Sequence, residues 1–346
     1  MITELKKAID RKIPSFIKSI DTTYSLSKIS PLLYTCIKDF VTRDGKRVRP
    51  ILFVVGYLGF AKKTAPRLYT SALAIELLHD FMLVHDDIID KSDTRRGRPS
   101  MHALLNTHLK KLRGLKFDGQ DLAIVVGDVM YAMAIDAFLA IKEEPYRKEK
   151  ALKNFIRAAI FTGGGEFIEL LNDAKKIEQV TKNDIYKIYD FKTAYYTFAT
   201  PLSTGAILAG APASAIRGLS SYGVALGRAF QIKDDILGIF GNEKQIGKST
   251  LSDLQESKKT LLIWNTFLNS SAKDRLRIKK MLTKDKVTRG DLSLMQQLIT
   301  RTGALDYAHS EIKRLIGQAQ GIAEKIPMHQ KYKKLLLTYP AQLLRV

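Results

Sequence analysis

The sequence predicts an all-α protein. Apolar residues recur at spacings of three and four, the period of one face of a helix, in segments spread along the chain. One such stripe lies near the N-terminus and consists of Leu5, Ile9, Ile13, Phe16, Ile17 and Ile20. Further stripes cover residues 68–82, 152–160 and 305–315. Strict alternation of apolar and polar residues is scarce, and no Asn-Gly or Asp-Gly pair joins two β-rich runs.

Two helix starts are marked by their polar residues. Thr181 to Asp184 and Thr288 to Asp291 each have the layout of a capping box, in which the first and fourth residues satisfy each other's backbone N–H groups. Residues 122–140 and 200–211 are apolar on more than one face. We expect these two helices to be buried inside a larger bundle.

The organisation of the chain predicts one domain over residues 1–346. Apolar residues make up 45% and charged residues 26% of the 346, which suits a globular protein with a sizeable core. No long Pro/Ser/Gly linker and no low-complexity tract interrupts the helical pattern.

Charge and cysteine content restrict the class of partner and the compartment. The formal net charge of +21 indicates an anionic partner, which could be nucleic acid, a membrane surface or a phosphorylated substrate. The one cysteine, Cys36, cannot form an internal disulfide. Residues 1–20 lack the uninterrupted apolar core of a secretory signal, and no stretch approaches the roughly 20 apolar residues that cross a bilayer. We therefore expect a cytoplasmic protein.

Two acidic clusters follow apolar helical segments. Asp86 and Asp90 are one helical turn apart and share a face, and Asp234-Asp235 ends a second apolar stretch. A solvated helix end would explain either cluster alone. Two such ends in a basic protein instead favour a site for Mg²⁺, which binds a few carboxylates and keeps other positions for water and phosphate oxygens.

Basic residues accompany these clusters. Arg95 and Arg96 follow the first cluster, and Lys46, Arg47 and Arg49 lie in a compact turn between a glycine and a proline. Arginine offers a planar fork that matches phosphate oxygens, and lysine adds a point charge. Carboxylates and cations together predict a metal-dependent diphosphate site.

Five segments in order resemble the motifs of trans-prenyl diphosphate synthases. Asp86-Asp87-Ile88-Ile89-Asp90 with Arg95-Arg96-Gly97 resembles the first aspartate-rich motif, and Phe230 to Asp235 resembles the second. The others are Gly45-Lys46-Arg47-Val48-Arg49-Pro50, similar to the GKRxRP element; Phe191-Lys192-Thr193, similar to the lysine-threonine motif; and Gly247-Lys248 with residues 253–260, similar to the closing loop.

The resemblance implies a large helical bundle of the isoprenoid synthase type with a central active-site cavity. It also implies a homodimer and about three magnesium ions per site. Asp86, Asp90 and Asp234 would bind the metal, with Asp87 and Asp235 supporting them.

Substrate roles follow by position from the same resemblance. The allylic diphosphate would be held by Arg95, Lys192, Lys233 and Lys258, with Lys248 joining on loop closure. Isopentenyl diphosphate would be held by Lys46, Arg49, His79 and Arg96. Thr193 and Gln231 would line the path of the carbocation that forms when the allylic C–O bond breaks.

The product is expected to be geranylgeranyl diphosphate, with farnesyl or longer polyprenyl diphosphates as alternatives. Phe81 lies five residues before Asp86, about 7.5 Å along the helix axis. In similar family members an aromatic residue there forms the floor of the product tunnel, beside the position of Met82. This sequence departs from the family at Gly238, where a third aspartate is common, and at Ser257, where glycine is usual.

Two alternatives of other classes remain at this point. A terpene cyclase would share the fold but needs no second diphosphate, so Lys46, Arg49 and His79 argue against it. A basic nucleic-acid-binding helical protein would explain the charge, although paired aspartates repel phosphate without metal and no recognition motif is present. The excess charge could also hold the protein near anionic membranes.

Overall fold

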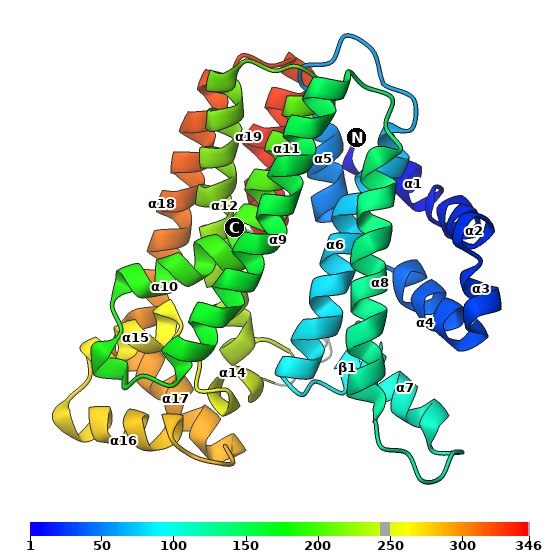
Figure 1. Cartoon of the computed structure of the whole chain (residues 1–346). Coiled ribbons are helices and arrows are strands. Elements are labelled where there is room, and N and C mark those ends of the chain that lie inside the picture. The colour runs from blue at the N-terminus through cyan, green and yellow to red at the C-terminus, as the bar shows by residue number, and fades with distance from the viewer. Residues whose placement is uncertain (243–249, 345–346) are drawn as a thin grey trace. The chain divides into compact units, whose positions relative to one another are not determined.

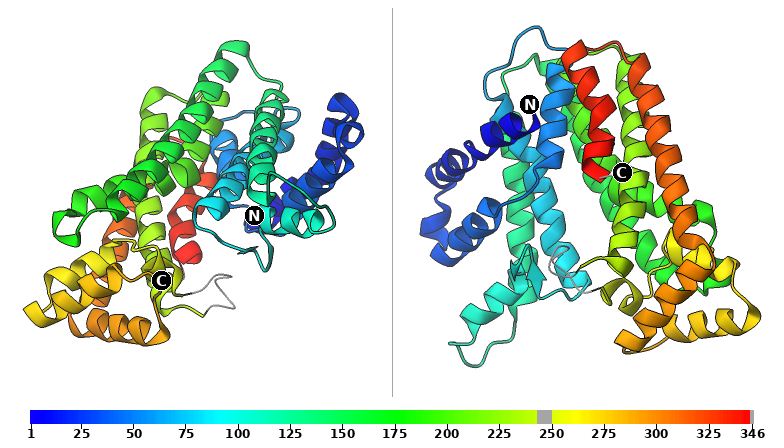
Figure 2. Two further views of the ribbon diagram at one scale, coloured as in Figure 1. Left: turned by 60° about the horizontal axis from the view of Figure 1, so that its bottom comes forward. Right: turned by 180° about the vertical axis from the view of Figure 1, so that it is seen from behind.

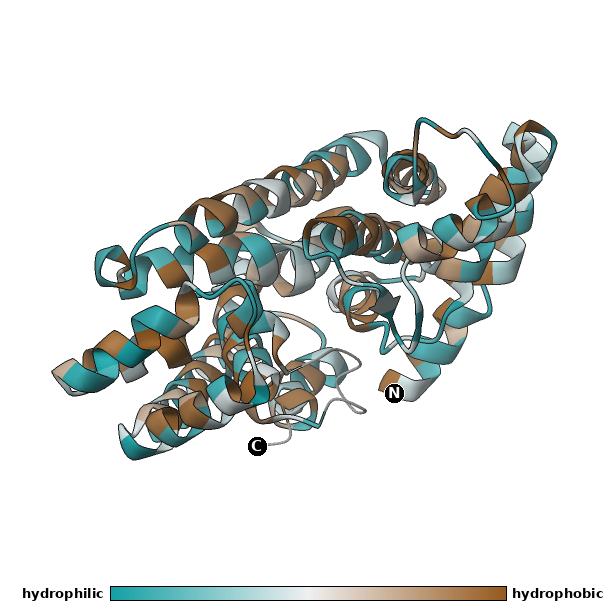
Figure 3. Ribbon diagram, turned by 90° about the horizontal axis from the view of Figure 1, so that it is seen from below, coloured by the Kyte–Doolittle hydropathy of each residue, from teal (hydrophilic) through white to brown (hydrophobic). Residues whose placement is uncertain are grey.

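The computed structural model describes residues 1–242 and 250–344. It is almost entirely helical, which confirms the all-α prediction (Figure 1). Within the described ranges the only strands are β1 (Thr94–Arg95) and β2 (Arg98–Pro99), which pair antiparallel with Arg95 opposite Arg98. Hydrophobic and hydrophilic segments alternate along the helical ribbons (Figure 3), as amphipathic helices around a core require.

The chain divides into two compact units. The first comprises residues 1–152 and 204–210, and the second comprises residues 153–203 and 211–346. Helices α9 (Pro145–Asp173) and α11 (Thr200–Leu208) contribute residues to both. The single domain over residues 1–346 stays a prediction.

The first unit is built around three neighbouring helices, α5, α6 and α8, with shorter helices beside them. Helix α6 packs along α8, α5 packs on α6, and α7 packs on α8. The bounds of its helices are α1 (Ile2–Asp10), α2 (Ile13–Tyr24), α3 (Leu26–Ile29), α4 (Pro31–Thr42), α5 (Val48–Leu58), α6 (Leu68–Ile89), α7 (Met101–Leu109) and α8 (Gly119–Leu139).

Helices α6 and α8 run antiparallel. The hydroxyl of Ser71, near the start of α6, donates a hydrogen bond to the carbonyl of Phe138, near the end of α8, at 3.3 Å. Towards the other end, Gly127 lies so close to His85 that a Cβ at residue 127 would meet Nε2 at 2.4 Å. The C-terminal end of α6 therefore lies at the N-terminal end of α8.

Helix α8 corrects two sequence expectations. Ile124, Val125 and Leu139 are exposed, so this helix is not buried on all faces, whereas α11 is buried along most of its length. Helix α8 is also long and apolar enough to cross a membrane, with 44% of the apolar window buried within the protein. The expectation that no segment could cross a bilayer was therefore wrong. Asp128 and Asp136 interrupt the apolar sequence of α8, but the mean hydropathy of the helix stays as high as that of a membrane-spanning helix.

The second unit is built around α12 (Ala213–Phe240), which packs against α18 and η2 (Figure 2). The remaining elements are η1 (Ile177–Gln179), α10 (Lys182–Ile188), the π-helix η2 (Tyr189–Ala199), α14 (Ser252–Gln255), α15 (Leu261–Leu268), α16 (Ala272–Leu282), α17 (Arg289–Arg301), α18 (Ala304–Lys325) and α19 (Gln330–Leu344). The predicted capping boxes at Thr181 and Thr288 are confirmed at the starts of α10 and α17.

Two glycines set the distance between α12 and η2. A Cβ at Gly223 would lie 2.4 Å from backbone atoms of Ala199, and one at Gly227 would lie 2.4 Å from the Cα of Ala194. No real Cβ contact is that short, so the two helices approach closely only because these positions lack a side chain.

Candidate active site

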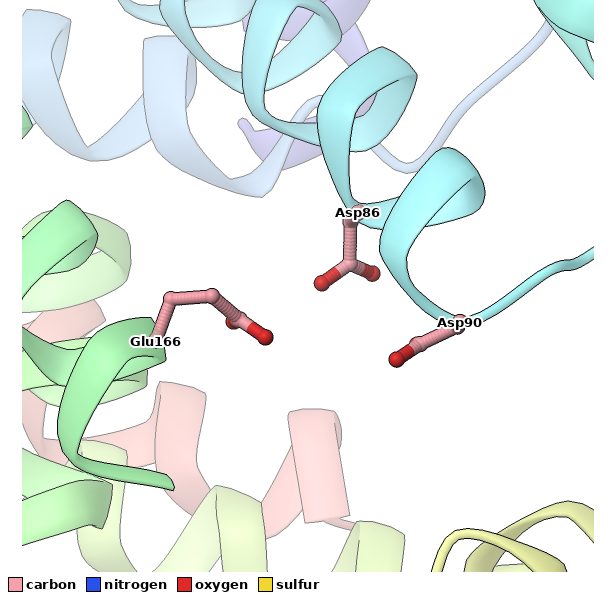
Figure 4. A group of neighbouring side chains, drawn as sticks. All are labelled: Asp86, Asp90 and Glu166. Carbon is pink, nitrogen blue, oxygen red and sulfur yellow. The ribbon is translucent and has the colours of Figure 1, made fainter. Parts of the chain in front are cut away.

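Asp86 and Asp90 project from consecutive turns at the C-terminal end of α6 (Figure 4). Asp90 is the C-cap residue, and its backbone N–H donates to the carbonyl of Asp86 at 2.8 Å. Both side chains are half-buried. The two carboxylates offer the hard oxygen donors that Mg²⁺ accepts, so the donor set fits the implied metal.

Asp87, the neighbour of Asp86 in sequence, is fully buried. Nε of Arg95 donates to its Oδ1 at 2.8 Å, and Nη2 of Arg95 lies 3.5 Å from Oδ2 of Asp86. Burial raises the pKa of Asp87, and the Arg95 guanidinium opposes that rise. The carboxylate of Asp87 thus holds Arg95 beside the carboxylate of Asp86.

The basic turn before α5 has three residues with different environments. Lys46 is exposed and Arg49 is half-buried, whereas Arg47 is buried and adopts a left-handed φ of 50°. Nη1 of Arg47 lies 2.6 Å from Oε1 of Glu76, and Nε lies 2.9 Å from Oδ1 of Asp10. Arg47 therefore anchors the turn to α6 and α1, while Lys46 and Arg49 flank it.

A buried acidic pair on α6 faces these cations. Nη2 of Arg96 lies 3.7 Å from Oε1 of Glu76 and 3.6 Å from Oδ1 of Asp80. Asp80 is fully buried, and neither of its oxygens has a hydrogen-bond partner. Burial, reinforced by the neighbouring Glu76, raises the pKa of Asp80 to about 8.

Sequence reasoning missed Glu76 and Asp80, although a pattern for them existed. They are the two acidic residues of an otherwise apolar run and are four residues apart, so they share a helical face. His79 lies beside them. Burial and then the positive charges of Arg49 and Arg96 lower the pKa of this imidazole well below its ordinary value.

Phe81, the predicted floor residue, lies on α6 and packs against α8. Its ring centroid lies 4.7 Å from that of His85 and 5.2 Å from that of Tyr131. Phe81 and Met82 are both half-buried. The ring has fixed neighbours on its own helix and on α8, which are the contacts a floor residue needs to hold its position.

In the second unit, the second acidic pair divides into an exposed and a buried member. Asp234 is exposed, whereas Asp235 is buried and accepts a hydrogen bond from Nε2 of Gln231 at 3.0 Å and another from the hydroxyl of Tyr189. The hydroxyl of Thr193 donates to Oε1 of Gln231 at 2.6 Å. Burial raises the pKa of Asp235 to about 7, against the lowering effect of its hydrogen bonds. Thr193 and Gln231, predicted together, are thus linked to Asp235.

Lys192 on η2 is held by two glutamates of α9 that sequence reasoning missed. Its Nζ lies 2.6 Å from Oε2 of Glu166 and also contacts Glu169. The run of three glycines at residues 163–165 was the sequence pattern that could have pointed to this contact. A Cβ at Gly165 would lie 2.4 Å from the backbone nitrogen of Lys192, so glycine lets α9 approach η2 closely. Figure 4 draws Glu166 on its helix.

Both departures from the family pattern have a structural reason. A Cβ at Gly238 would lie 2.2 Å from Oδ2 of Asp253, so a carboxylate from α14 occupies the place of a side chain at residue 238. Ser257 has a left-handed φ of 58°, the backbone conformation for which glycine is favoured. Its hydroxyl donates to the carbonyl of Leu282 at 2.6 Å, which helps to hold that conformation.

The remaining cations predicted to bind the allylic diphosphate are Lys258, Lys233 and Lys248. Nζ of Lys258 lies 2.5 Å from Oε2 of Glu256, and Lys233 is half-buried on α12. Lys248, expected to act on loop closure, lies outside the described residues.

Known proteins similar to this chain define its family. A sequence model described as polyprenyl synthetase matches residues 30–299. The chain is 31% identical over 343 residues to the geranylgeranyl diphosphate synthase of Saccharolobus solfataricus, which covers 98% of this chain and 95% of that protein. It is also 31% identical over 302 residues to the geranylfarnesyl diphosphate synthase of Aeropyrum pernix, covering 86% of this chain and 88% of that protein.

The fold agrees with a solved structure of geranylgeranyl pyrophosphate synthase from Corynebacterium glutamicum, complexed with isoprenyl diphosphate and magnesium. The TM-score is 0.89 at 24% sequence identity, over 99% of this chain and 98% of that one. This likeness confirms the predicted isoprenoid synthase type of helical bundle. Because the family model spans most of the chain and relatives above 30% identity span nearly all of it, the chain belongs to the polyprenyl synthetase family and is a prenyltransferase.

Proposed function

We propose that this prenyltransferase condenses isopentenyl diphosphate with an allylic diphosphate. The observation that carries the proposal is the end of α6, where Asp86 and Asp90 follow each other by one turn and the guanidinium of Arg95 lies 3.5 Å from the carboxylate of Asp86. Carboxylate oxygens suit a divalent cation, and a guanidinium suits diphosphate oxygens. A chain of this family with both groups at one helix end is equipped for a metal-diphosphate complex.

We assign the metal to Asp86, Asp90 and Asp234, with Asp87 and Asp235 in support and about three Mg²⁺ ions per site. The environments support this division, since Asp87 and Asp235 are buried and occupied by Arg95, Tyr189 and Gln231. Bound magnesium would stabilise negative charge on the leaving diphosphate.

The allylic diphosphate is assigned to Arg95, Lys192, Lys233 and Lys258, with Lys248. Isopentenyl diphosphate is assigned to Lys46, Arg49, His79 and Arg96. In support of the second set, the positive charges of Arg49 and Arg96 lower the pKa of His79, so cationic charge is concentrated around this imidazole.

The reaction then needs no nucleophilic side chain. The allylic C–O bond breaks with its electron pair leaving on pyrophosphate, and the double bond of isopentenyl diphosphate forms the new C–C bond. A proton leaves the resulting cation to the released pyrophosphate. Thr193 and Gln231 would line the cation's path, where their oxygens stabilise positive charge, and loop closure would exclude water.

The role of the first acidic cluster can be tested by one isosteric substitution. Asp86→Asn should lower kcat for condensation about 100-fold or more, because a charged metal ligand is lost. The matched control is Asp93→Asn, which removes an exposed carboxylate three residues beyond Asp90 and should leave kcat within about twofold. Equal effects of the two substitutions would refute the assignment.

We propose geranylgeranyl diphosphate as the product, with farnesyl and longer polyprenyl diphosphates as alternatives. The name of the Saccharolobus relative supports C20, and that of the Aeropyrum relative supports the next longer product. Phe81, held by His85 and Tyr131, is the proposed floor, with Met82 beside it.

Shortening the floor residue tests this choice. Phe81→Ala should lengthen the main product by one or more isoprene units, because the tunnel gains the volume of the ring. Chromatography of the dephosphorylated products measures the length. Phe60→Ala, which shortens a half-buried phenylalanine outside α6, is the control and should change nothing. Identical product spectra for all three proteins would reject the floor assignment.

We further propose a cytoplasmic homodimer with peripheral contact to an anionic membrane. The exposed apolar side chains of α8, Ile124, Val125 and Leu139, support pairing with a second copy, because such a surface is stabilised when it is covered. The buried, free thiol of Cys36 suits a reducing compartment. The net charge of +21 supports the membrane contact.

A further inference from the structure

The connection between α7 and α8 presents large apolar side chains among cations. Every residue from Lys110 to Asp118 is exposed. Leu112, Leu115 and Phe117 are 57%, 37% and 44% exposed. Four cations and no acidic residue accompany them in residues 110–117: Lys110, Lys111, Arg113 and Lys116. We call residues 110–117 the basic–apolar loop.

Both ends of the basic–apolar loop are fixed. The side-chain oxygen of Asn106 on α7 accepts a hydrogen bond from the backbone N–H of Gly119 at 2.8 Å. Asp118 and Asp121 form a capping box at the start of α8. A Cβ at Gly119 would lie 2.3 Å from the carbonyl of His102, so the chain leaves α7 and enters α8 in close contact. The loop is therefore displayed from a rigid base.

The base does not bury the apolar side chains of the loop. A left-handed Gly114, with φ of 69°, turns the chain at the middle of the loop, where a Cβ would meet no atom within 4 Å. Three large apolar side chains remain in water, which is unfavourable unless another surface covers them.

The loop also has a defined place within the first unit. Because α6 and α8 run antiparallel, the segment before α8 lies at the end of the unit where α6 terminates in Asp86 and Asp90 (Figure 1). A surface bound by the loop would thus face the substrate-binding end of α6.

We propose that the basic–apolar loop docks on anionic lipid bilayers, with Leu112, Leu115 and Phe117 inserted at the headgroup boundary and the four cations on lipid phosphates. Interfacial elements combine these two features, since insertion needs apolar side chains and anionic lipid attracts lysine and arginine. A nucleic-acid site would use the cations and could stack on Phe117, but it has no use for the two leucines. The inference deepens the membrane contact of the proposed function and rests on it.

The test is flotation of the full chain with two kinds of vesicle. One is phosphatidylcholine alone, and the other contains about 30 mol% phosphatidylglycerol, to mimic an anionic leaflet. The chain should bind the anionic vesicles. Leu112→Ser/Leu115→Ser/Phe117→Ser should lower the partition coefficient at least about tenfold, since each lost apolar side chain removes buried area. Substituting the four loop cations by glutamine should lower it at least as much.

Matched controls separate the loop from the general charge of the protein. Leu276→Ser changes another exposed leucine, and glutamine at Lys62, Lys63, Lys150 and Lys313 removes the same four charges from exposed sites elsewhere. Both controls should bind within about threefold of the unaltered chain. Equal losses in the loop and control charge variants would overturn the proposal, as would binding that ignores the apolar substitutions. Loop-dependent binding of single-stranded RNA in place of vesicles would overturn it as well.

Activity without vesicles separates this inference from the proposed reaction. Condensation in vesicle-free solution should be unchanged in the loop variants, because no loop residue is assigned to the site. If the unaltered chain bound vesicles through the loop but condensed no substrate, the proposed reaction would fail while the docking surface stood. If it condensed substrate but floated with no vesicle, the docking surface and the membrane contact would fail while the proposed reaction stood.

Discussion

Asp80 is a fully buried carboxyl group in the first unit, and its charged neighbours have both signs. It faces Glu76, another acid, together with the cations Arg47, Arg49 and Arg96. Desolvation outweighs the attraction of these cations, so its pKa rises from 3.8 to about 8. The protein therefore holds a carboxyl group that is neutral at a pH where the unfolded chain has it ionised.

Asp80→Asn should change the pH dependence of stability. A carboxyl whose pKa is raised by folding stabilises the protein fully only below its unfolded pKa, and this contribution is lost as pH rises towards about 8. The substitution removes this dependence. The variant should gain stability relative to the unaltered chain between about pH 4 and about pH 8, by on the order of 1 kcal/mol or more.

Denaturant unfolding at several pH values measures this difference. Asp39→Asn is the control, because Asp39 is a half-buried carboxylate that is paired with Arg43 and Arg98. A stability difference for Asp80→Asn that stays flat across the window would contradict the account.

At Ser257 the strain of the backbone and the hydrogen bond of the side chain have opposite effects on stability. Its left-handed backbone costs about 1 kcal/mol or more, and its hydrogen bond to Leu282 returns a similar amount. Ser257→Gly should leave the free energy of unfolding within about 0.5 kcal/mol, because it removes both terms. Ser257→Ala keeps the strain and should destabilise by about 1 kcal/mol. The idea fails if alanine is tolerated better than glycine in chemical unfolding.

At the scale of elements, local sequence patterns predicted where helices begin better than they predicted which helix faces are buried. The capping boxes at Thr181 and Thr288 are confirmed because a cap needs only residues three apart. The burial of α8 was predicted wrongly because composition does not tell which side of a helix has a partner. The pairing of Arg47 with Glu76 was missed because 29 residues separate them in sequence.

The close packing of α12 on η2 gives a prediction at this scale. Gly227→Ala should destabilise the protein by about 1–3 kcal/mol, because the added Cβ meets the backbone of Ala194 at 2.4 Å and overpacks the contact. It should also raise KM for the allylic substrate, since η2 carries Lys192 and Thr193. Unfolding curves and initial rates measure the two effects.

The matched control is the same substitution at a site with room. Gly317 is exposed on α18, and a Cβ there would meet nothing within 4 Å. Gly317→Ala should therefore stabilise by about 0.5–1 kcal/mol through helix propensity. Destabilisation of equal size at both positions would show that close packing is not what glycine provides at residue 227.

At the scale of the whole molecule, ordered motifs predicted more than composition did. The net charge of +21 was compatible with nucleic acid, membrane or phosphorylated substrates, whereas five motifs in order resembled one family, and the family model then matched residues 30–299. Motifs could not reveal the side chains that hold the cations. Glu76, Glu166 and Glu169 contact Arg47 or Lys192 only once the chain has folded.

The central claim is that the chain joins isopentenyl diphosphate to an allylic diphosphate. The most direct measurement follows radiolabelled isopentenyl diphosphate into chain-lengthened product with geranyl or farnesyl diphosphate as primer, with Mg²⁺ or with excess chelator. We predict a labelled C20 product with Mg²⁺ and none with chelator. Ionisation of the allylic diphosphate without incorporation of label, as a terpene cyclase would give, would contradict the claim.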